Sequence, residues 1–192
     1  GIDGATGCVQ TCAVKADVTV TFQCAKRGHF FADGPDYCGR LIVRDIGLGQ
    51  AKGELARVTE ADVRAAFPMR RRNSHKGIYG HLLLVAGSYG MAGAASLAAN
   101  AALRSGCGLV SIACPRSIVP ILQTLAPCAM CLPLEEQDGA LSEAALPALR
   151  EALSGKSAAA IGPGLSRRAA PRLLEEVLAS GLPAVIDADA LN

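Results

Sequence analysis

Short apolar runs alternate with segments of helical spacing from residue 82 to residue 186, and this alternation most constrains the fold. Five runs have the composition of buried strands: 82–85, 109–113, 129–132, 158–161 and 184–186. Four intervening segments have the spacing of helices: 92–105, 117–125, 142–153 and 170–179. Because apolar strands separated by helices form parallel sheets covered on both faces, we predict a doubly wound α/β fold.

Residues 1–50 follow a different pattern. The stretch ADVTVTF alternates and places Val18, Val20 and Phe22 on one face, as in a half-exposed strand. A loop marked by glycine and aspartate follows, then a second strand in RLIVRDIGLG, and we expect no helix between the two strands. A stretch of this length cannot close a core alone, so we expect it to be the tail of a larger domain.

The composition excludes two classes of partner. Hydrophobic residues make up 51% of the chain, charged residues 19%, and the net charge is only +2. This balance gives no electrostatic footprint for nucleic acid, and no apolar stretch approaches the ~20 residues that a membrane helix needs. We expect a soluble, cytoplasmic protein that binds a small molecule, with neither nucleic acid nor membrane as a partner.

The spacing and surroundings of the eight cysteines do not indicate a set of disulfides or a metal site. We interpret the four between residues 107 and 131 as small apolar side chains in or beside buried strands, and the four before residue 50 as structural. Cys128 and Cys131 form a C-x-x-C motif, but no second pair lies at metal-binding spacing. We therefore expect neither a zinc site nor a redox site.

The candidate site lies in the loops that follow the strands, because ligands of open parallel sheets bind beyond the carboxyl ends of the strands. Gly87, Gly90 and Gly93 follow the first apolar run with the spacing G-x-x-G-x-x-G, which differs from the dinucleotide fingerprint G-x-G-x-x-G. Gly162 and Gly164 flank a proline after another run. Each loop suits either a tight turn or an anion held by backbone N–H groups.

Carboxylates follow the last apolar run. Asp187 and Asp189 are candidates for binding magnesium or a ribose hydroxyl, and an N-cap role for one of them is the alternative. Both interpretations remain open from spacing alone.

The segment before the first run carries further charged residues. A short helix is expected in VTEADVRAAFP, ended by Pro68, and the basic cluster Arg70–Arg72 follows it. Lys76 is a candidate phosphate contact, and His75 or His81 a candidate acid or base. The alternatives are solvated side chains for the cations and structural roles for the histidines.

Longer stretches resemble a known family. KGIYGHLLLVAGSYGMAGAASLAANAALRSGCGLV, AIGPGL and VIDADALN occur in this order and resemble the carbohydrate-kinase-type domain of the NAD(P)H-hydrate dehydratases. Residues 1–50 resemble the C-terminal end of the NAD(P)H-hydrate epimerase domain. The resemblance implies an internal fragment of a bifunctional NAD(P)H-hydrate repair enzyme. Residues 1–50 would end a Rossmann-like epimerase domain, and residues 55–192 would form the N-terminal half of a ribokinase-like, mostly parallel dehydratase domain.

The resemblance also implies an activity. The epimerase interconverts the R and S forms of hydrated NAD(P)H, with K⁺ in its site. The dehydratase phosphorylates the added hydroxyl of the S form from ADP or ATP with Mg²⁺, and then eliminates phosphate to restore NAD(P)H. We expect the full-length protein to be a homo-oligomer. Two alternatives remain: a ribokinase-fold kinase of a small alcohol such as a vitamin precursor, and a non-catalytic nucleotide-binding module.

Residue roles follow from the resemblance position by position. Ala94 and Gly164 match positions that contact the hydrated dinucleotide, and the wall around them is shaped by Gly87, Ser88 and Gly90. The nucleotide and metal region matches the strand end that carries Asp187, Asp189 and Asn192. The family's catalytic aspartate, in a G-[TS]-G-D segment, is expected beyond residue 192, so we expect this chain alone to be inactive.

Overall fold

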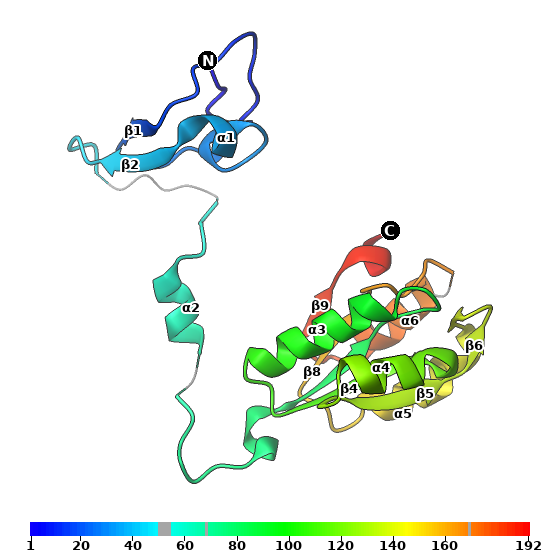
Figure 1. Ribbon diagram of the computed structural model, residues 1–192. Helices are drawn as coiled ribbons and strands as arrows, with labels where there is room; N and C mark the ends of the chain where they lie inside the picture. The colour runs from blue at the N-terminus through cyan, green and yellow to red at the C-terminus, as the bar shows by residue number, and fades with distance from the viewer. Residues whose placement is uncertain (50–54, 68, 169) are drawn as a thin grey trace. The chain divides into compact units, whose positions relative to one another are not determined.

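The computed structural model describes residues 1–49, 55–67, 69–168 and 170–192 of the chain. The chain forms two compact units, Gly1–Thr59 and Glu60–Asn192 (Figure 1). Pro68, expected to end a short helix, lies outside the described residues; that helix is α2, Glu60–Ala66.

A five-stranded parallel sheet forms the centre of the second unit and confirms the predicted α/β fold. Its spatial order is β5-β4-β3-β8-β9, so the first strand of the unit is the central one. The strands are β3 (His81–Val85), β4 (Leu109–Pro115), β5 (Met130–Leu134), β8 (Ala158–Ile161) and β9 (Ala184–Ile186). Each lies within two residues of the apolar run that predicted it.

Four helices cover the sheet: α3 (Ala92–Arg104), α4 (Val119–Leu125), α5 (Leu146–Leu153) and α6 (Ala170–Ala179). The segments predicted as helices at 117–125 and 142–153 begin instead with 3₁₀ turns, at Arg116–Ile118 and Glu143–Ala145. In both cases a proline occupies the first turn of the α-helix that follows, where its missing N–H costs no hydrogen bond.

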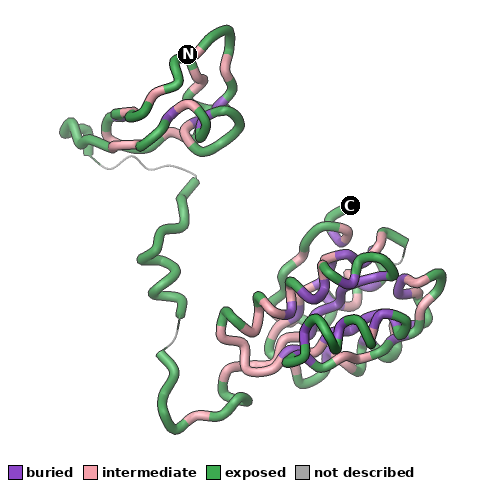
Figure 2. The backbone as a smooth tube through the Cα atoms, viewed as in Figure 1, coloured by how far each residue is buried: buried purple, intermediate pink, exposed green. Residues whose placement is uncertain are grey.

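Both faces of the sheet are buried at its inner strands, as the apolar runs predicted (Figure 1, Figure 2). Leu83 and Val85 of the central strand pack with the buried side chains of α5 and α6, whereas Leu84 packs with those of α3 and α4. Successive side chains of a strand point to opposite faces, so β3 supplies both cores. The alanines of α3 let that helix lie close to the sheet, with Ala95 and Ala99 fully buried.

A small hairpin that the sequence analysis missed follows β5. Its strands are β6 (Glu136–Gln137) and β7 (Ala140–Leu141), paired antiparallel. Asp138 and Gly139 form the two-residue turn with φ values of 52° and 76°. Asp-Gly is a strong signal for such a turn, but the flanking strands are too short to show alternation.

The first unit corrects one expectation. Strands β1 (Val18–Phe22) and β2 (Arg40–Arg44) pair in parallel, and a 3₁₀ turn at Arg27–His29 and helix α1 (Gly34–Cys38) lie between them. The expectation that nothing helical separates them is therefore wrong. Parallel strands need a crossover connection, and this helix is too short to show periodicity in the sequence.

Strand β1 alternates as predicted, but its apolar face is the exposed one. Val18, Val20 and Phe22 are 44%, 53% and 57% exposed. Thr21 on the opposite face is buried, and its hydroxyl accepts a hydrogen bond from Nζ of Lys26 at 2.9 Å.

The cysteines are all unpaired, and several differ from the expected burial. Cys128 is exposed, so its interpretation as a small apolar side chain beside a buried strand is wrong. Cys8, Cys12 and Cys24, which we interpreted as structural, are exposed as well. Cys114 is fully buried, and burial raises the pKa of its thiol to about 12. Among the residues that the structure describes, no helix has the length and hydropathy needed to cross a bilayer.

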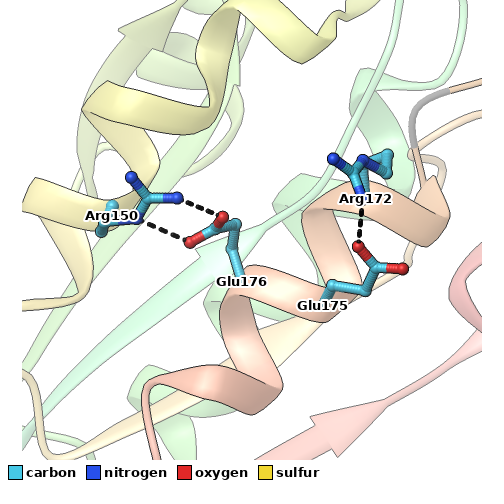
Figure 3. A network of polar contacts seen from close by, with 4 residues as sticks. All are labelled: Arg150, Arg172, Glu175 and Glu176. Carbon is cyan, nitrogen blue, oxygen red and sulfur yellow. Dashed lines mark hydrogen bonds and ion pairs between the residues drawn. The ribbon is translucent and has the colours of Figure 1, made fainter.

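Helices α5 and α6 are joined by a bidentate ion pair. Nε of Arg150 donates to Oε2 of Glu176 at 2.9 Å, and its Nη2 atom contacts Oε1 (Figure 3). One turn away, Arg172 donates to Glu175 at 2.7 Å within α6. The hydrogen bonds from Arg150 lower the pKa of Glu176 below its ordinary value.

This shift predicts an acid-dependent contribution to stability. A carboxylate with a lowered pKa in the folded state stabilises the protein at neutral pH, and the contribution disappears as the pH falls through that lowered pKa. Replacing Glu176 by glutamine should therefore flatten the dependence of the unfolding free energy on pH below the ordinary glutamate pKa. Denaturant melts across this acid range measure it. The control is Glu175→Gln, which removes a solvent-exposed pair and should leave the slope as in the wild type. Equal slopes for wild type and Glu176→Gln would contradict the prediction.

Candidate functional site

The loops after β3, β8 and β9 lie at the carboxyl edge of the sheet, because all three strands run parallel. The hairpin after β5 joins them through contacts to two of these loops. The four segments that form this edge are 86–91, 136–141, 162–168 and 187–192. We call them the carboxyl-edge loops.

Two glycine loops are hydrogen-bonded to each other. The backbone N–H of Gly87 donates to the carbonyl of Pro163 at 2.9 Å, and the buried Ser88 hydroxyl donates to the carbonyl of Gly164 at 2.9 Å. Gly87 has a φ of +86°, and a β-carbon there would lie 2.7 Å from Cδ1 of Ile118. The loop after β3 and the loop after β8 thus form one continuous wall.

Ala94 lies beside Gly164 in this wall. A β-carbon at Gly164 would lie 3.1 Å from Cβ of Ala94 and 2.9 Å from the carbonyl oxygen of Met91. Gly164 has a φ of +62°, so both its conformation and its surroundings favour glycine. Gly90 also has a positive φ, +85°, but it is exposed and a side chain there would meet nothing within 4 Å.

The aspartates after β9 have separate environments. A carboxylate oxygen of Asp189 accepts the backbone N–H of Ser166 at 3.0 Å, so this side chain holds the loop after β8. Asp187 is exposed, and neither residue caps the short helix that follows through its side chain. The Asn192 amide donates to the carbonyl of Ala188 at 2.9 Å, which closes the last turn.

The described ranges contain no group of three or more histidine, cysteine or acidic side chains placed to hold a metal ion. The exposed Asp187 carboxylate fits a site for Mg²⁺ bound to a nucleotide. In such sites the protein commonly supplies only one or two carboxylates, and the substrate phosphates supply further ligands. The Cys128 and Cys131 pair is likewise outside any metal cluster among the described residues.

The candidates before β3 lie away from the carboxyl-edge loops. His81 begins β3, at the opposite end of the strand from Gly87, and its Nε2 lies 2.8 Å from the Ser111 hydroxyl. Burial, and then the charge of Lys156, lower the pKa of His81. His75 and Lys76 are exposed in the same amino-side region. The structure therefore separates these residues from the glycine loops.

The basic cluster has a structural partner. The Arg70 guanidinium lies 4.4 Å from the ring centroid of Tyr79 and donates to the carbonyl of Gly106 at 2.7 Å. Arg71 and Arg72 are exposed, in agreement with the solvated alternative.

Sequence reasoning missed the hairpin and Tyr89. The backbone N–H of Tyr89 donates to the carbonyl of Gly139 at 2.7 Å, and Asp138 forms an ion pair with Arg168 in the loop after β8. The Asp-Gly pair in the sequence was the available signal for the hairpin, but nothing in the sequence placed it beside Tyr89.

Residues 82–192 match the family described as NAD(P)H-hydrate dehydratase. Two curated relatives are bifunctional NAD(P)H-hydrate repair enzymes. The protein of Coxiella burnetii is 41% identical over the whole of this chain, and the protein of Moorella thermoacetica is 45% identical over the same extent. The chain spans 39% and 38% of the lengths of these two relatives.

Solved structures agree with the sequence comparison. The ADP/ATP-dependent NAD(P)H-hydrate dehydratase of Bacillus subtilis, co-crystallised with ATP and Mg²⁺, matches 69% of this chain and 46% of its own, with a TM-score of 0.56 and 36% identity. A ribokinase-like superfamily protein of Enterococcus faecalis matches 69% of this chain and 45% of its own, with a TM-score of 0.58 and 25% identity. With its five-stranded parallel sheet and a match over more than half its length, the chain belongs to the NAD(P)H-hydrate dehydratase family.

Proposed function

We propose that this chain forms part of the substrate-binding wall of an ADP- or ATP-dependent NAD(P)H-hydrate dehydratase. The full-length protein then restores NAD(P)H from its S hydrate. The observation that carries the proposal is the pair of hydrogen-bonded glycine loops after β3 and β8, where Ser88 binds the carbonyl of Gly164. These loops lie within the region that matches the family.

Small residues suit this wall to a bulky ligand. Ala94 is half-buried and carries only a methyl group, so a flat or charged ligand can approach the main chain closely there, while the buried Gly164 packs behind it. Ala94 lies in the first turn of helix α3, and Met91 at the N-cap of this helix makes no side-chain cap. The N–H of Ala94 donates to the Met91 carbonyl at 3.2 Å, so it is the other N–H groups of the first turn of α3 that suit the pyrophosphate of a dinucleotide.

The proposed reaction activates a leaving group. Transfer of a phosphoryl group from ADP or ATP to the added hydroxyl, which loses its proton, replaces a poor leaving group with phosphate. The lone pair of the ring nitrogen then expels the phosphate, and loss of a proton from the adjacent ring carbon restores the double bond. The protein must hold two anionic ligands in line and stabilise the transferring phosphoryl group. Asp187 at the end of β9 supports Mg²⁺ binding with the donor nucleotide. The metal, when bound, neutralises phosphate charge.

The reaction also needs a group that removes the proton from the substrate hydroxyl. We propose that it comes from a region that the longer curated relatives have and this chain does not span. In the same proposal, residues 1–50 belong to an epimerase domain that interconverts the R and S hydrates with K⁺. The full-length protein assembles as a cytoplasmic homo-oligomer.

A bulky side chain in the wall tests the substrate-binding role. Replacing half-buried Ala94 by leucine should raise the dissociation constant for S-hydrated NADH by at least about tenfold, because the added atoms occupy the ligand's space. Isothermal titration calorimetry on the full-length protein measures this. The matched control is Ala101→Leu, which adds the same volume at an exposed position of the same helix and should leave the affinity unchanged. An unaltered affinity in Ala94→Leu, with its fold intact, would remove Ala94 from the wall.

A further inference from the structure

Tyr89 stands out among the carboxyl-edge loops. The chain has three tyrosines, four phenylalanines and no tryptophan, and Tyr89 is the single one of these aromatic residues after position 79. Its side chain is 75% exposed, although Ser88 beside it is buried. A large exposed aromatic side chain next to a buried, hydrogen-bonded loop is available to contact a ligand.

The backbone of Tyr89 is held in place from the side of the hairpin. Its N–H donates to the carbonyl of Gly139 at 2.7 Å, and a β-carbon at Gly139 would lie 2.5 Å from Cβ of Tyr89. Gly139 therefore packs directly against the base of the tyrosine side chain. The turn is itself tied to the loop after β8 by the ion pair between Asp138 and Arg168.

From these contacts we infer that Tyr89 is a positioned stacking surface for the adenine base of the hydrated dinucleotide, and that the hairpin Glu136–Leu141 supports it. The inference rests on the proposed function and adds a specificity-determining residue to it. The reduced nicotinamide ring is not aromatic, and addition of water also saturates one of its double bonds, whereas adenine is a flat aromatic system. Adenine is thus the part of this substrate that stacks well on a tyrosine ring.

The position of Tyr89 agrees with this assignment. Gly87, Ser88 and Gly164 are buried at the inner part of the wall, and Tyr89 lies at its exposed rim. The adenine end of the substrate, which does not react, fits this rim. Binding energy from such a remote part positions the reacting part.

Binding of two probes to the full-length protein tests the inference. Tyr89→Ala should raise the dissociation constant for S-hydrated NADH about three- to tenfold, while Tyr89→Phe keeps the ring and should bind like the wild type. Hydrated nicotinamide mononucleotide in its reduced form has the same reacting ring but no adenine, so Tyr89→Ala should bind it as the wild type does. Leu97→Ala, which truncates a side chain that is 72% exposed on α3, is the control for non-specific surface effects.

The hairpin's role is tested by a double-mutant cycle. Gly139→Ala should weaken binding of S-hydrated NADH by displacing Tyr89, and combining it with Tyr89→Ala should cause no further loss. Gly155→Ala controls for an alanine at positive φ, since Gly155 has a φ of +69° in open space.

Three results would overturn the inference. Wild-type affinity of Tyr89→Ala for S-hydrated NADH excludes the stacking surface but leaves the proposed function standing. Equal losses with both probes exclude adenine as the stacked ring. Failure of the wild-type protein to bind either probe overturns the proposed function itself, and the inference with it.

Discussion

The substitution Gly162→Ala should lower the unfolding free energy by about 3 to 5 kcal/mol. We expect this to be the largest loss among glycine-to-alanine substitutions in the carboxyl-edge loops. Gly162 has a φ of +126°, and a β-carbon there would lie 1.7 Å from the carbonyl oxygen of Asp187. The obstacle is main chain, so no side-chain rotation relieves it. To accommodate the added β-carbon, the loops after β8 and β9 must move apart. This movement weakens or breaks the 3.0 Å hydrogen bond from the Asp187 N–H to the Ile161 carbonyl.

Gly155→Ala is the matched control for this substitution. Gly155 also has a positive φ, +69°, but a β-carbon there meets nothing within 4 Å. It should cost only about 1 kcal/mol, the strain of alanine in the left-handed region. Urea unfolding gives both values, provided that the denaturant slope is unchanged. Equal losses in the two variants would show that the contact with Asp187 is not what requires glycine at position 162.

Truncation of Ile161 to alanine should remove about 2 to 5 kcal/mol of unfolding free energy. The Ile161 side chain is fully buried at the end of β8, in the core that α5 and α6 cover. Its loss leaves a cavity directly before the glycine loop 162–164. The expected effect therefore includes weaker support for that loop as well as lost burial.

Val185→Ala on the neighbouring strand is the control for the Ile161 variant. Val185 is 65% exposed on β9, so its truncation should cost less than about 1 kcal/mol. Thermal and urea unfolding of the two variants give the comparison. A loss at Val185 as large as the loss at Ile161 would contradict the account that the burial of Ile161, rather than its place in a strand, determines the cost.

The fold of the second unit followed from the sequence because its strands are apolar on both faces. Runs such as Leu82–Val85 supply both cores, so they need no alternation to be recognised. Short elements carry no such signal. Helix α1 in GPDYC and the hairpin around Asp138 span too few residues for a period to appear, and both were missed.

The sequence predicted where the candidate site lies, but it did not predict the hydrogen bonds and contacts within the site. The rule that ligands bind beyond strand ends selected the glycine loops and the aspartates after β9, and the structure places these segments at one edge. The hydrogen bond of Asp189 to Ser166 and the contact of Gly139 with Tyr89 join residues distant in sequence. No spacing pattern encodes such pairs.

The two glycine loops have a structural function that is separate from any ligand. Gly87 and Gly164 satisfy backbone geometry that other residues would strain, and the Ser88 hydroxyl joins the two loops. Stability and binding are therefore coupled at these positions, and variants there must be tested for both. Ala94 and Tyr89 separate the two properties better, because neither has a positive φ and Tyr89 is exposed.

One measurement tests the central claim most directly. The full-length protein is incubated with S-hydrated NADH, Mg²⁺ and either ADP or ATP, and the absorbance of reduced nicotinamide is followed. The account predicts that absorbance recovers only with a nucleotide present and that phosphate is released in equal amount. Phosphorylation of a small alcohol with no recovery of NADH would instead support a ribokinase-fold kinase. Nucleotide binding without turnover would support a non-catalytic module, and either result would contradict the account.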